Sequence, residues 1–158
     1  MKCLILPDIR SAHNVGAMFR TADAAGVTKL FLSGHSPSPT DRFGRVQPEI
    51  KKTSLGASET VEWEYIDNLP QLIVDLRQRG VTVVAIEQSS KSVSLTEFNV
   101  PEKVAYVMGN EVDGVPEHIQ ALCDVVVELP MLGHKESLNV ATTAGIVLYH
   151  QIDTRSKK

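Results

Sequence analysis

The sequence predicts an α/β domain in which a mostly parallel sheet is flanked by helices. Short β-branched or leucine-rich runs alternate with longer segments of helical period, which is the pattern of successive βα units. Most of the short runs are nearly continuous in apolar character, as expected of strands covered on both faces. The chain has 158 residues, 42% of them hydrophobic, which is enough for one domain with a core of its own.

Six strands and four helices are predicted. The strands are the apolar runs at residues 3–6, 29–32, 61–66, 81–86, 104–108 and 125–129. The helical periods cover residues 13–25, 69–79, 116–122 and 137–152. Gly26 and Gly80 directly follow two of these helices, where a left-handed C-cap is expected. Ser137 stands where the N-cap of the last helix is expected.

Two segments differ from the regular alternation. Residues 33–60 form the longest stretch without a clear period, and long irregular segments in compact domains tend to be functional. The last helix, 137–152, is apolar nearly all round, so we expect it to be buried on more than one side. In a chain this small, another subunit is the expected cover for the second side.

The charge balance limits how this chain could bind nucleic acid. The net charge is −3, whereas a protein that grips nucleic acid by a broad cationic surface is usually basic. Positive charge would therefore have to be local. Two basic clusters offer it, one of Arg42, Arg45, Lys51 and Lys52 and one of Arg155, Lys157 and Lys158. Each cluster could also be only a solvated surface, which is the more common role of charge clusters this small.

Several classes of protein are excluded. The two cysteines, Cys3 and Cys123, are far apart and have no metal-ligand spacing around them, which argues against a disulfide scaffold or a metal site. The apolar run at the N-terminus is too short for a signal peptide, and no stretch reaches the ~20 apolar residues of a membrane span. We therefore expect a cytoplasmic protein with no membrane and no metal.

Three motifs combine glycine, asparagine and single charges. The first is Asn-Val-Gly-Ala-Met-Phe-Arg at residues 14–20, near the carboxyl edge of the predicted sheet, where ligands bind in parallel α/β folds. The arginine fork suits phosphate, but Asn14 could instead cap the helix and Arg20 could lie on the surface. The second motif, residues 107–116, has a glycine at a strand end, which would let a ligand approach the backbone, or it is a plain βα turn.

The third motif, residues 129–140, runs from a strand through a loop into the last helix. Its Ser-Leu-Asn could be a helix cap or part of a site. None of the three is a dinucleotide fingerprint, a P-loop or a Gly-x-Ser-x-Gly elbow, so a generic nucleotide-binding protein and a serine hydrolase have little support.

Together and in this order, the three motifs resemble those of the SPOUT superfamily. The pattern is Asn-x-Gly-x-x-x-Arg-Thr-Ala after the first strand, Met-Gly-Asn-Glu with Gly-Val-Pro after a late strand, and Leu-Pro-Met with Ser-Leu-Asn-Val before the terminal helix. It is most similar to the TrmH (SpoU) branch, whose members are RNA ribose 2′-O-methyltransferases. The resemblance extends over nearly the whole chain, from Pro7 to Tyr149.

The resemblance implies a fold, a methyl donor and a partner. It implies a C-terminal deep trefoil knot whose loops hold S-adenosyl-L-methionine, a homodimer built on the knot regions, and tRNA or rRNA as substrate. It also implies one catalytic domain over residues 1–158 without an appended RNA-binding domain. The donor-binding positions it implies are Ile86, Glu87, Gln88, Gly109, Asn110, Leu129, Met131, Ser137 and Leu138.

By the same resemblance, the catalytic positions are Asn14, Arg20, Glu111, Ser137 and Asn139. Arg20 of one subunit would reach the donor pocket of the other and lie near the reacting hydroxyl and its phosphate. Because a guanidinium is effectively always protonated, we expect Arg20 to orient the phosphate rather than to act as the base. Asn14 would hold the nucleotide, and Glu111 would fix the loop geometry and the neighbouring arginine. Ser137 and Asn139 would form hydrogen bonds near the donor or the ribose.

Two alternatives remain from the sequence. A related SPOUT enzyme could methylate a base, or a ribose at the tRNA wobble position. A catalytically silent RNA-binding protein could keep the same scaffold, although retention of every motif residue argues against it.

Overall fold

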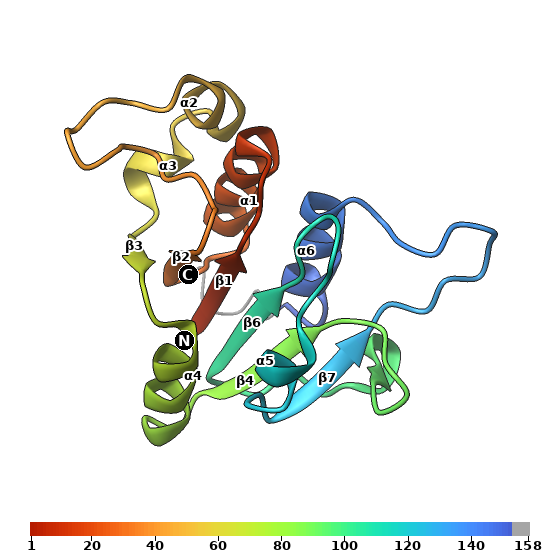
Figure 1. Ribbon diagram of the computed structural model, residues 1–158. Helices are drawn as coiled ribbons and strands as arrows, with labels where there is room; N and C mark the ends of the chain where they lie inside the picture. The colour runs from red at the N-terminus through yellow and green to blue at the C-terminus, as the bar shows by residue number, and fades with distance from the viewer. Residues whose placement is uncertain (153–158) are drawn as a thin grey trace.

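The computed structural model describes residues 1–152 and contains one seven-stranded sheet whose strand pairs are all parallel (Figure 1). The strand order is β3-β2-β1-β6-β4-β7-β5. The strands are β1 (Lys2–Pro7), β2 (Lys29–Ser33), β3 (Trp63–Ile66), β4 (Thr82–Ile86), β5 (Val93–Ser94), β6 (Val104–Met108) and β7 (Val125–Glu128). The predicted parallel α/β architecture is thus confirmed.

Helices cover both faces of this sheet. They are α1 (Ala12–Ala24), α2 (Pro48–Ser54), α3 (Ala57–Thr60), α4 (Leu69–Gln78), α5 (Glu117–Gln120) and α6 (Val140–Tyr149), with a 3₁₀ turn at Leu95–Glu97. The residues of β1 alternate between two cores. Leu4 and Leu6 pack with α1 and α6, whereas Cys3 and Ile5 pack with α4 and α5. Burial on both faces explains why the strands are continuously apolar.

The structure moves several predicted boundaries, most clearly those of the third strand and of the last helix. The third strand begins at Trp63 rather than at residue 61. The last helix covers Val140–Tyr149, and its N-cap is Asn139 rather than Ser137. Asn139 takes this place because its Oδ1 accepts hydrogen bonds from the backbone N–H groups of Ala141 and Thr142. Ser137 is thereby left free to line a pocket.

The sequence analysis predicted no helix within residues 33–60 and no strand between residues 86 and 104. Residues 33–60 contain α2 and α3, which are seven and four residues long and too short to show a helical period. The short strand β5 and the 3₁₀ turn after it were not predicted either.

Gly26 and Gly80 have φ values of +68° and +73°, which confirms both predicted left-handed C-caps.

The structure does not test three of the expectations from the sequence. The trefoil knot and the single-domain organisation stay predictions. Arg155, Lys157 and Lys158 lie outside the described residues. Within residues 1–152, no helix combines the length and the apolar character that crossing a membrane requires.

Helix α1 carries two of the motif residues, and a glycine lets it pack closely against α2. A Cβ at Gly16 would overlap the Thr53 hydroxyl and lie 2.9 Å from the backbone oxygen of Ile50. The side-chain hydroxyl could rotate away, but the backbone oxygen could not. Glycine at position 16 is therefore required for the position of α2 against α1.

We expect Gly16→Ala to lower the free energy of unfolding by about 1–3 kcal/mol, because the added methyl overpacks this contact. Gly145→Ala is the matched control in α6, since a Cβ there would meet only the Thr21 methyl, at 3.8 Å. The control should leave stability unchanged or raise it by up to about 1 kcal/mol through helix propensity. Urea unfolding of both variants measures the difference, and equal stabilities would contradict the packing argument.

Candidate active site

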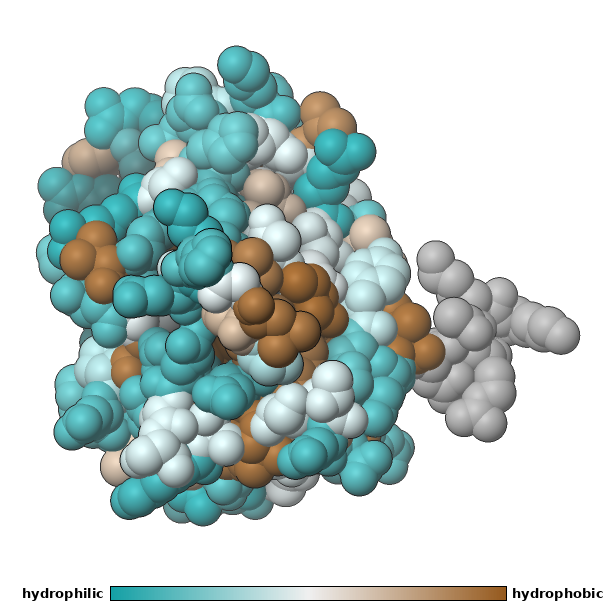
Figure 2. All heavy atoms as spheres, turned by 90° about the vertical axis from the view of Figure 1, so that its right-hand side faces the viewer, coloured by the Kyte–Doolittle hydropathy of each residue, from teal (hydrophilic) through white to brown (hydrophobic). Residues whose placement is uncertain are grey.

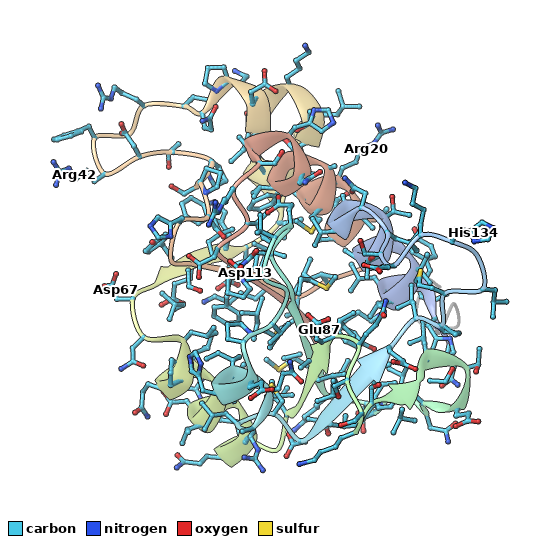
Figure 3. All side chains as sticks on the ribbon, turned by 45° about the vertical axis from the view of Figure 1, so that its right-hand side comes forward. Arg20, Arg42, Asp67, Glu87, Asp113 and His134 are labelled. Carbon is cyan, nitrogen blue, oxygen red and sulfur yellow. The ribbon has the colours of Figure 1, made fainter. Side chains whose placement is uncertain are left out.

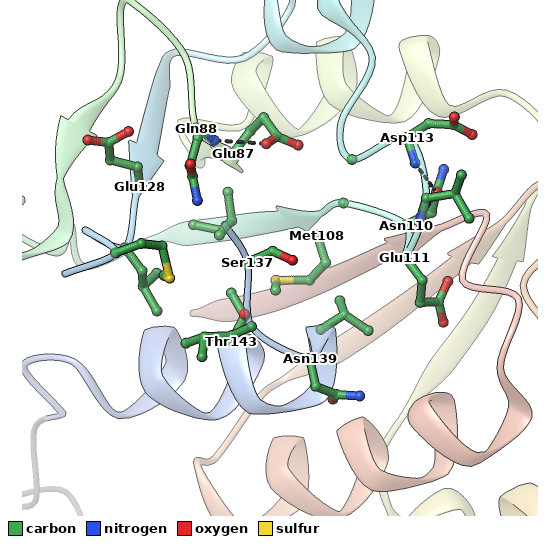
Figure 4. Close-up of a pocket in the computed structure, with 18 residues that line it drawn as sticks. Glu87, Gln88, Met108, Asn110, Glu111, Asp113, Glu128, Ser137, Asn139 and Thr143 are labelled. Carbon is green, nitrogen blue, oxygen red and sulfur yellow. Dashed lines mark hydrogen bonds between the residues drawn. The ribbon is translucent and has the colours of Figure 1, made fainter. Parts of the chain in front are cut away.

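A pocket of about 550 Å³ opens at the carboxyl edge of the sheet (Figure 4). It lies where β4, β6 and β7 end, and the segment that leads into α6 closes its remaining side. Its volume is in the range of small-molecule sites. Every donor-binding residue implied by the resemblance lines it, namely Ile86, Glu87, Gln88, Gly109, Asn110, Leu129, Met131, Ser137 and Leu138.

The loop after β6 is folded back tightly on itself. The backbones of Asn110 and Gly114 pair through two hydrogen bonds, and Asn110 Oδ1 accepts from the N–H groups of Val112 and Asp113, both at 2.8 Å. A Cβ on Gly109 would lie 2.8 Å from Gly114 Cα. Glycine at position 109 is therefore required for closing the loop, which is a different reason from the ligand approach expected from sequence.

Glu87 supports this loop from the end of β4. Its carboxylate accepts hydrogen bonds from the N–H of Val115 at 2.7 Å and from the N–H of Gln88 at 2.8 Å. A Cβ on Gly114 would overlap the same carboxylate. Glu87 thus lines the pocket and also fixes the loop after β6 against β4.

A chain of side-chain hydrogen bonds joins the three sequence motifs. Asn139 Nδ2 donates to Asn14 Oδ1 at 3.2 Å, and Asn14 Nδ2 donates to Glu111 Oε1 at 3.0 Å. Glu111 also accepts from the N–H groups of Arg10 and Ser11, at 3.1 and 3.3 Å. Asn14 is only 8% exposed and does not cap α1, because Ser11 does so. Glu111 therefore accepts hydrogen bonds from backbone N–H groups and from the Asn14 side chain. Within residues 1–152 it does not pair with an arginine side chain, whereas the sequence analysis had expected such a pairing.

These hydrogen bonds also set the ionisation of Glu111. Partial burial opposes its charged form, but the hydrogen bonds from the Asn14 side chain and from the backbone of Arg10 and Ser11 outweigh that effect. Together they hold the pKa of Glu111 below its ordinary value. Glu111 is therefore an anchored carboxylate and a poor candidate for a general base near pH 7.

Arg20 does not line this pocket. It is exposed on α1 and lines a separate hollow beside Lys52, Leu55 and Tyr149, away from Glu87 and Asp113 (Figure 3). The structure thus brings together Asn14, Glu111 and Asn139 but leaves Arg20 apart within one chain. Within one chain, Arg20 is therefore not positioned to act at this pocket.

The pocket is acidic. Among the described residues that line it, four carry carboxylates, Glu87, Glu111, Asp113 and Glu128, and none is Lys, Arg or His. Its walls also present apolar side chains. A pocket of this kind suits a ligand with a flat or apolar part and a positive charge, and it disfavours one that carries phosphates.

Two lining residues were missed by the sequence analysis. Glu128, at the end of β7, accepts a hydrogen bond from the Ser92 hydroxyl at 2.7 Å, and Thr143 lies in the first turn of α6. No sequence pattern marked them, because Glu128 closes an otherwise apolar strand and Thr143 sits within an apolar helix. Within residues 1–152, no group of three or more His, Cys, Asp or Glu residues is placed to hold a metal ion.

One wall of the pocket belongs to a projecting loop. Residues 132–139 are all exposed, and Leu132 is 97% exposed. The loop extends to the right in Figure 1, and the side from which it projects shows apolar side chains near its centre among hydrophilic ones (Figure 2). Gln88 Nε2 donates a hydrogen bond to the backbone oxygen of Glu136 at 2.6 Å, and this bond joins the loop to the residues that follow β4.

Residues 1–149 match the model of the SpoU rRNA methylase family. The chain belongs to this family. A 23S rRNA (guanosine-2′-O-)-methyltransferase from Neisseria meningitidis serogroup B is 37% identical over 145 residues, which are 92% of this chain and 55% of that protein. The family membership expected from the motifs is therefore confirmed, and the chain spans just over half the length of the curated relatives it matches.

Solved structures agree with this assignment. An rRNA methyltransferase from Sinorhizobium meliloti, described as bound to AdoMet, has a TM-score of 0.82 at 25% identity over 94% of this chain and 54% of that one. A structure described as giving insights into the 2-OH methylation of C/U34 on tRNA has a TM-score of 0.79 at 28% identity. The match covers 94% of this chain and 92% of that one.

We expect Glu111→Gln to lower the free energy of unfolding at pH 7 by about 1 kcal/mol, because charge-assisted hydrogen bonds are lost. Since the pKa of Glu111 is lowered in the folded state, its contribution is present above the ordinary value of 4.5 and is lost as the pH falls through the folded value. The stabilities of wild type and variant should therefore converge on acidification.

Urea unfolding at pH values from about 7 down to about 2.5, well below the ordinary pKa of Glu111, measures this convergence. Asp113→Asn is the control from the same loop, because the Asp113 carboxylate accepts none of the hydrogen bonds found within residues 1–152. A constant gap between wild type and Glu111→Gln would show that the charge of Glu111 does not hold the network.

Proposed function

We propose that this chain transfers a methyl group from S-adenosyl-L-methionine to a ribose 2′-hydroxyl of rRNA or tRNA. The observation that carries the proposal is the acidic pocket, which the second and third sequence motifs line and which the first motif supports through Asn14. A sulfonium donor combines a flat adenine with positive charge and carries no phosphate, so it matches both the walls and the sign of the pocket. NAD and ATP do not match that sign.

The residues present fit this donor. Ile86, Leu129, Met131 and Leu138 offer apolar walls for the adenine and ribose, and Gln88, Asn110 and Ser137 offer hydrogen-bonding groups around them. When bound, the donor supplies an electrophilic methyl group, so the chain itself has to bind, orient and shield. These tasks need positioning, which can be worth about 7–11 kcal/mol in the best intramolecular cases.

The RNA needs a different electrostatic environment. A backbone phosphate brought to this pocket meets the carboxylates that line it, so a cation that does not line the pocket has to balance its charge. Arg20 is an exposed cation on α1, and it does not line the pocket of its own chain. We therefore propose a homodimer in which Arg20 of one subunit orients the phosphate next to the reacting ribose of the other. The phosphate oxygen then accepts the proton of the 2′-hydroxyl.

The network of Asn14, Glu111 and Asn139 has a supporting role in this proposal. It fixes the start of α1, the loop after β6 and the start of α6 relative to one another. These three segments border the place where donor and ribose meet. Asn14 and Asn139 each keep hydrogen-bonding capacity for the nucleotide, whereas both oxygens of Glu111 are already occupied.

The RNA target has two candidates. The curated relatives are named as 23S rRNA methyltransferases, and one structural relative is described by the 2-OH methylation of C/U34 on tRNA. We take both descriptions to mean ribose 2′-hydroxyl chemistry, so the proposed reaction is common to the two. The cytoplasm, which contains both RNAs, is the proposed location.

We expect the wild-type chain to transfer tritiated methyl groups from the donor to bulk unmodified rRNA or tRNA, at ribose 2′-positions. Arg20→Ala should reduce the rate by about two to three decades, equivalent to ~3–4 kcal/mol of transition-state stabilisation, with donor affinity nearly unchanged in calorimetry. Arg20→Lys should remain strongly impaired, because it keeps the charge but loses the fork. A wild-type rate for Arg20→Ala would remove Arg20 from the mechanism.

Mixed dimers test whether Arg20 acts on the partner's pocket. Leu138→Trp should fill the pocket from its exposed loop and abolish donor binding while leaving Arg20 intact. Each variant alone should be inactive. Coexpression of Arg20→Ala with Leu138→Trp should restore about a quarter of wild-type activity, because random two-fold pairing makes half the dimers mixed, with one complete site each. No recovery would indicate action within one chain.

A further prediction from this proposal concerns the dimer surface. Val147 and Leu148 are fully buried within the chain, whereas Ile146 and Tyr149 on the same helix are 42% and 48% exposed. We expect Ile146→Glu to weaken the dimer in sedimentation and to lower activity while the subunit stays folded. Val147→Glu should instead impair folding, because a buried unpaired charge is costly. An Ile146→Glu variant that stays dimeric would exclude this face.

A further inference from the structure

The segment between β2 and α2 contains a projecting loop, residues 40–46, drawn in orange in Figure 1. Its base is closed by antiparallel pairing of Thr40 with Val46. Asp41 fixes its tip from inside. The Asp41 carboxylate accepts hydrogen bonds from the N–H groups of Phe43 and Arg45 at 2.8 and 2.9 Å, and its backbone oxygen accepts from the N–H of Gly44. The conformation is therefore present before any partner binds.

The tip displays an aromatic ring between two cations. Phe43 is 68% exposed, and the guanidinium carbons of Arg42 and Arg45 lie 4.8 and 5.2 Å from the centre of its ring. Arg45 is also paired with Asp41 at 2.7 Å, whereas the Arg42 guanidinium makes no ion pair within residues 1–152. A mostly exposed phenylalanine contributes little to the core, so packing does not account for it.

The surroundings of the loop are locally basic. Residues 42–52 contain four basic side chains and one acidic one, a local charge of +3 in a chain of net charge −3. Lys51 and Lys52 are exposed on α2, and Lys52 lines the same hollow as Arg20. The loop and the pocket both lie at the carboxyl edge of the parallel sheet, because β2 leads into the loop and β4 and β6 lead into the pocket. Basic groups thus lead from the loop tip towards Arg20.

We propose that residues 40–46 bind an unpaired segment of the RNA substrate, with Phe43 stacking on a base and Arg42 contacting phosphate. Single-stranded RNA is recognised by stacking of unpaired bases on aromatic rings and guanidinium planes together with phosphate contacts, and the tip offers both. A paired helix keeps its bases stacked inside and would gain only the charge contacts. The loop therefore selects a target ribose that lies near unpaired nucleotides.

This inference rests on the proposed RNA methylation, and its test separates the two. Fluorescence anisotropy would measure binding of a labelled RNA hairpin with an eight-nucleotide loop and of a fully paired duplex of equal charge. We expect Phe43→Ala to weaken hairpin binding about 5- to 150-fold, which corresponds to about 1–3 kcal/mol for stacking one base. Duplex binding should change far less. Phe43→Tyr should retain hairpin binding, because the ring is kept.

Val46→Ala is the matched control, since Val46 is 51% exposed at the base of the same loop and only its backbone pairs with Thr40. It should bind like the wild type. Arg42→Ala should weaken hairpin binding and lower the slope of log affinity against log salt by about 0.7, as expected for one lost phosphate contact on a single strand. Donor affinity in calorimetry should stay constant in all these variants.

The outcomes are distinct. Equal hairpin affinity for wild type and Phe43→Ala overturns the loop proposal, and methyl transfer by the wild type to bulk RNA in the same preparation shows that the proposed function stands without it. A wild-type chain that neither binds nor methylates RNA overturns both. The remaining outcome is that a labelled polyglutamate peptide binds more tightly than the hairpin and loses that affinity in Phe43→Ala. That result would assign the loop to an acidic protein partner and would also overturn the proposal.

Discussion

The hydrogen-bonded chain from Asn139 through Asn14 to Glu111 is the interaction on which the carboxyl edge of this protein depends. It joins segments that are 97 and 125 residues apart in sequence, and each end contacts a different wall of the pocket. Asn14 is buried, so loss of either partner would leave a polar group without its hydrogen bond, which is costly in the interior. The three motifs are thus parts of one arrangement, because each contributes one residue to the network.

The acidic and basic residues of the molecule lie on separate surfaces, and each surface suits one of the two proposed ligands. The pocket gathers carboxylates, and the basic residues that could face RNA lie on α1, on α2 and on the loop between β2 and α2. Within one chain, the cationic donor and the anionic substrate are accommodated by separate surfaces. The proposed reaction requires that these surfaces meet, and the proposed assembly of two copies would bring them together without placing an arginine beside a sulfonium in either free subunit.

The sequence was informative where chemistry and periodicity coincide. Continuous apolar runs predicted the parallel strands, and the glycines after two helices predicted their C-caps, because each pattern has a single local cause. The helices α2 and α3 were missed because seven and four residues are too few to show a period. Ser137 was taken for the N-cap although Asn139 has that place, since either side chain can cap and only the tertiary fold chooses. The motifs identified the lining of the pocket, but the separation of Arg20 from it depends on how α1 lies in the assembled fold.

The projecting wall of the pocket has a thermodynamic consequence. Residues 132–138 are exposed throughout, so few packing contacts restrict their side chains in the free protein. A ligand that packs against Leu138 and Ser137 has to restrict their conformational freedom, and this restriction subtracts from its contact energy. Binding should therefore be accompanied by an unfavourable conformational entropy and a favourable enthalpy, and mutations that stiffen the wall would tighten affinity without adding any contact.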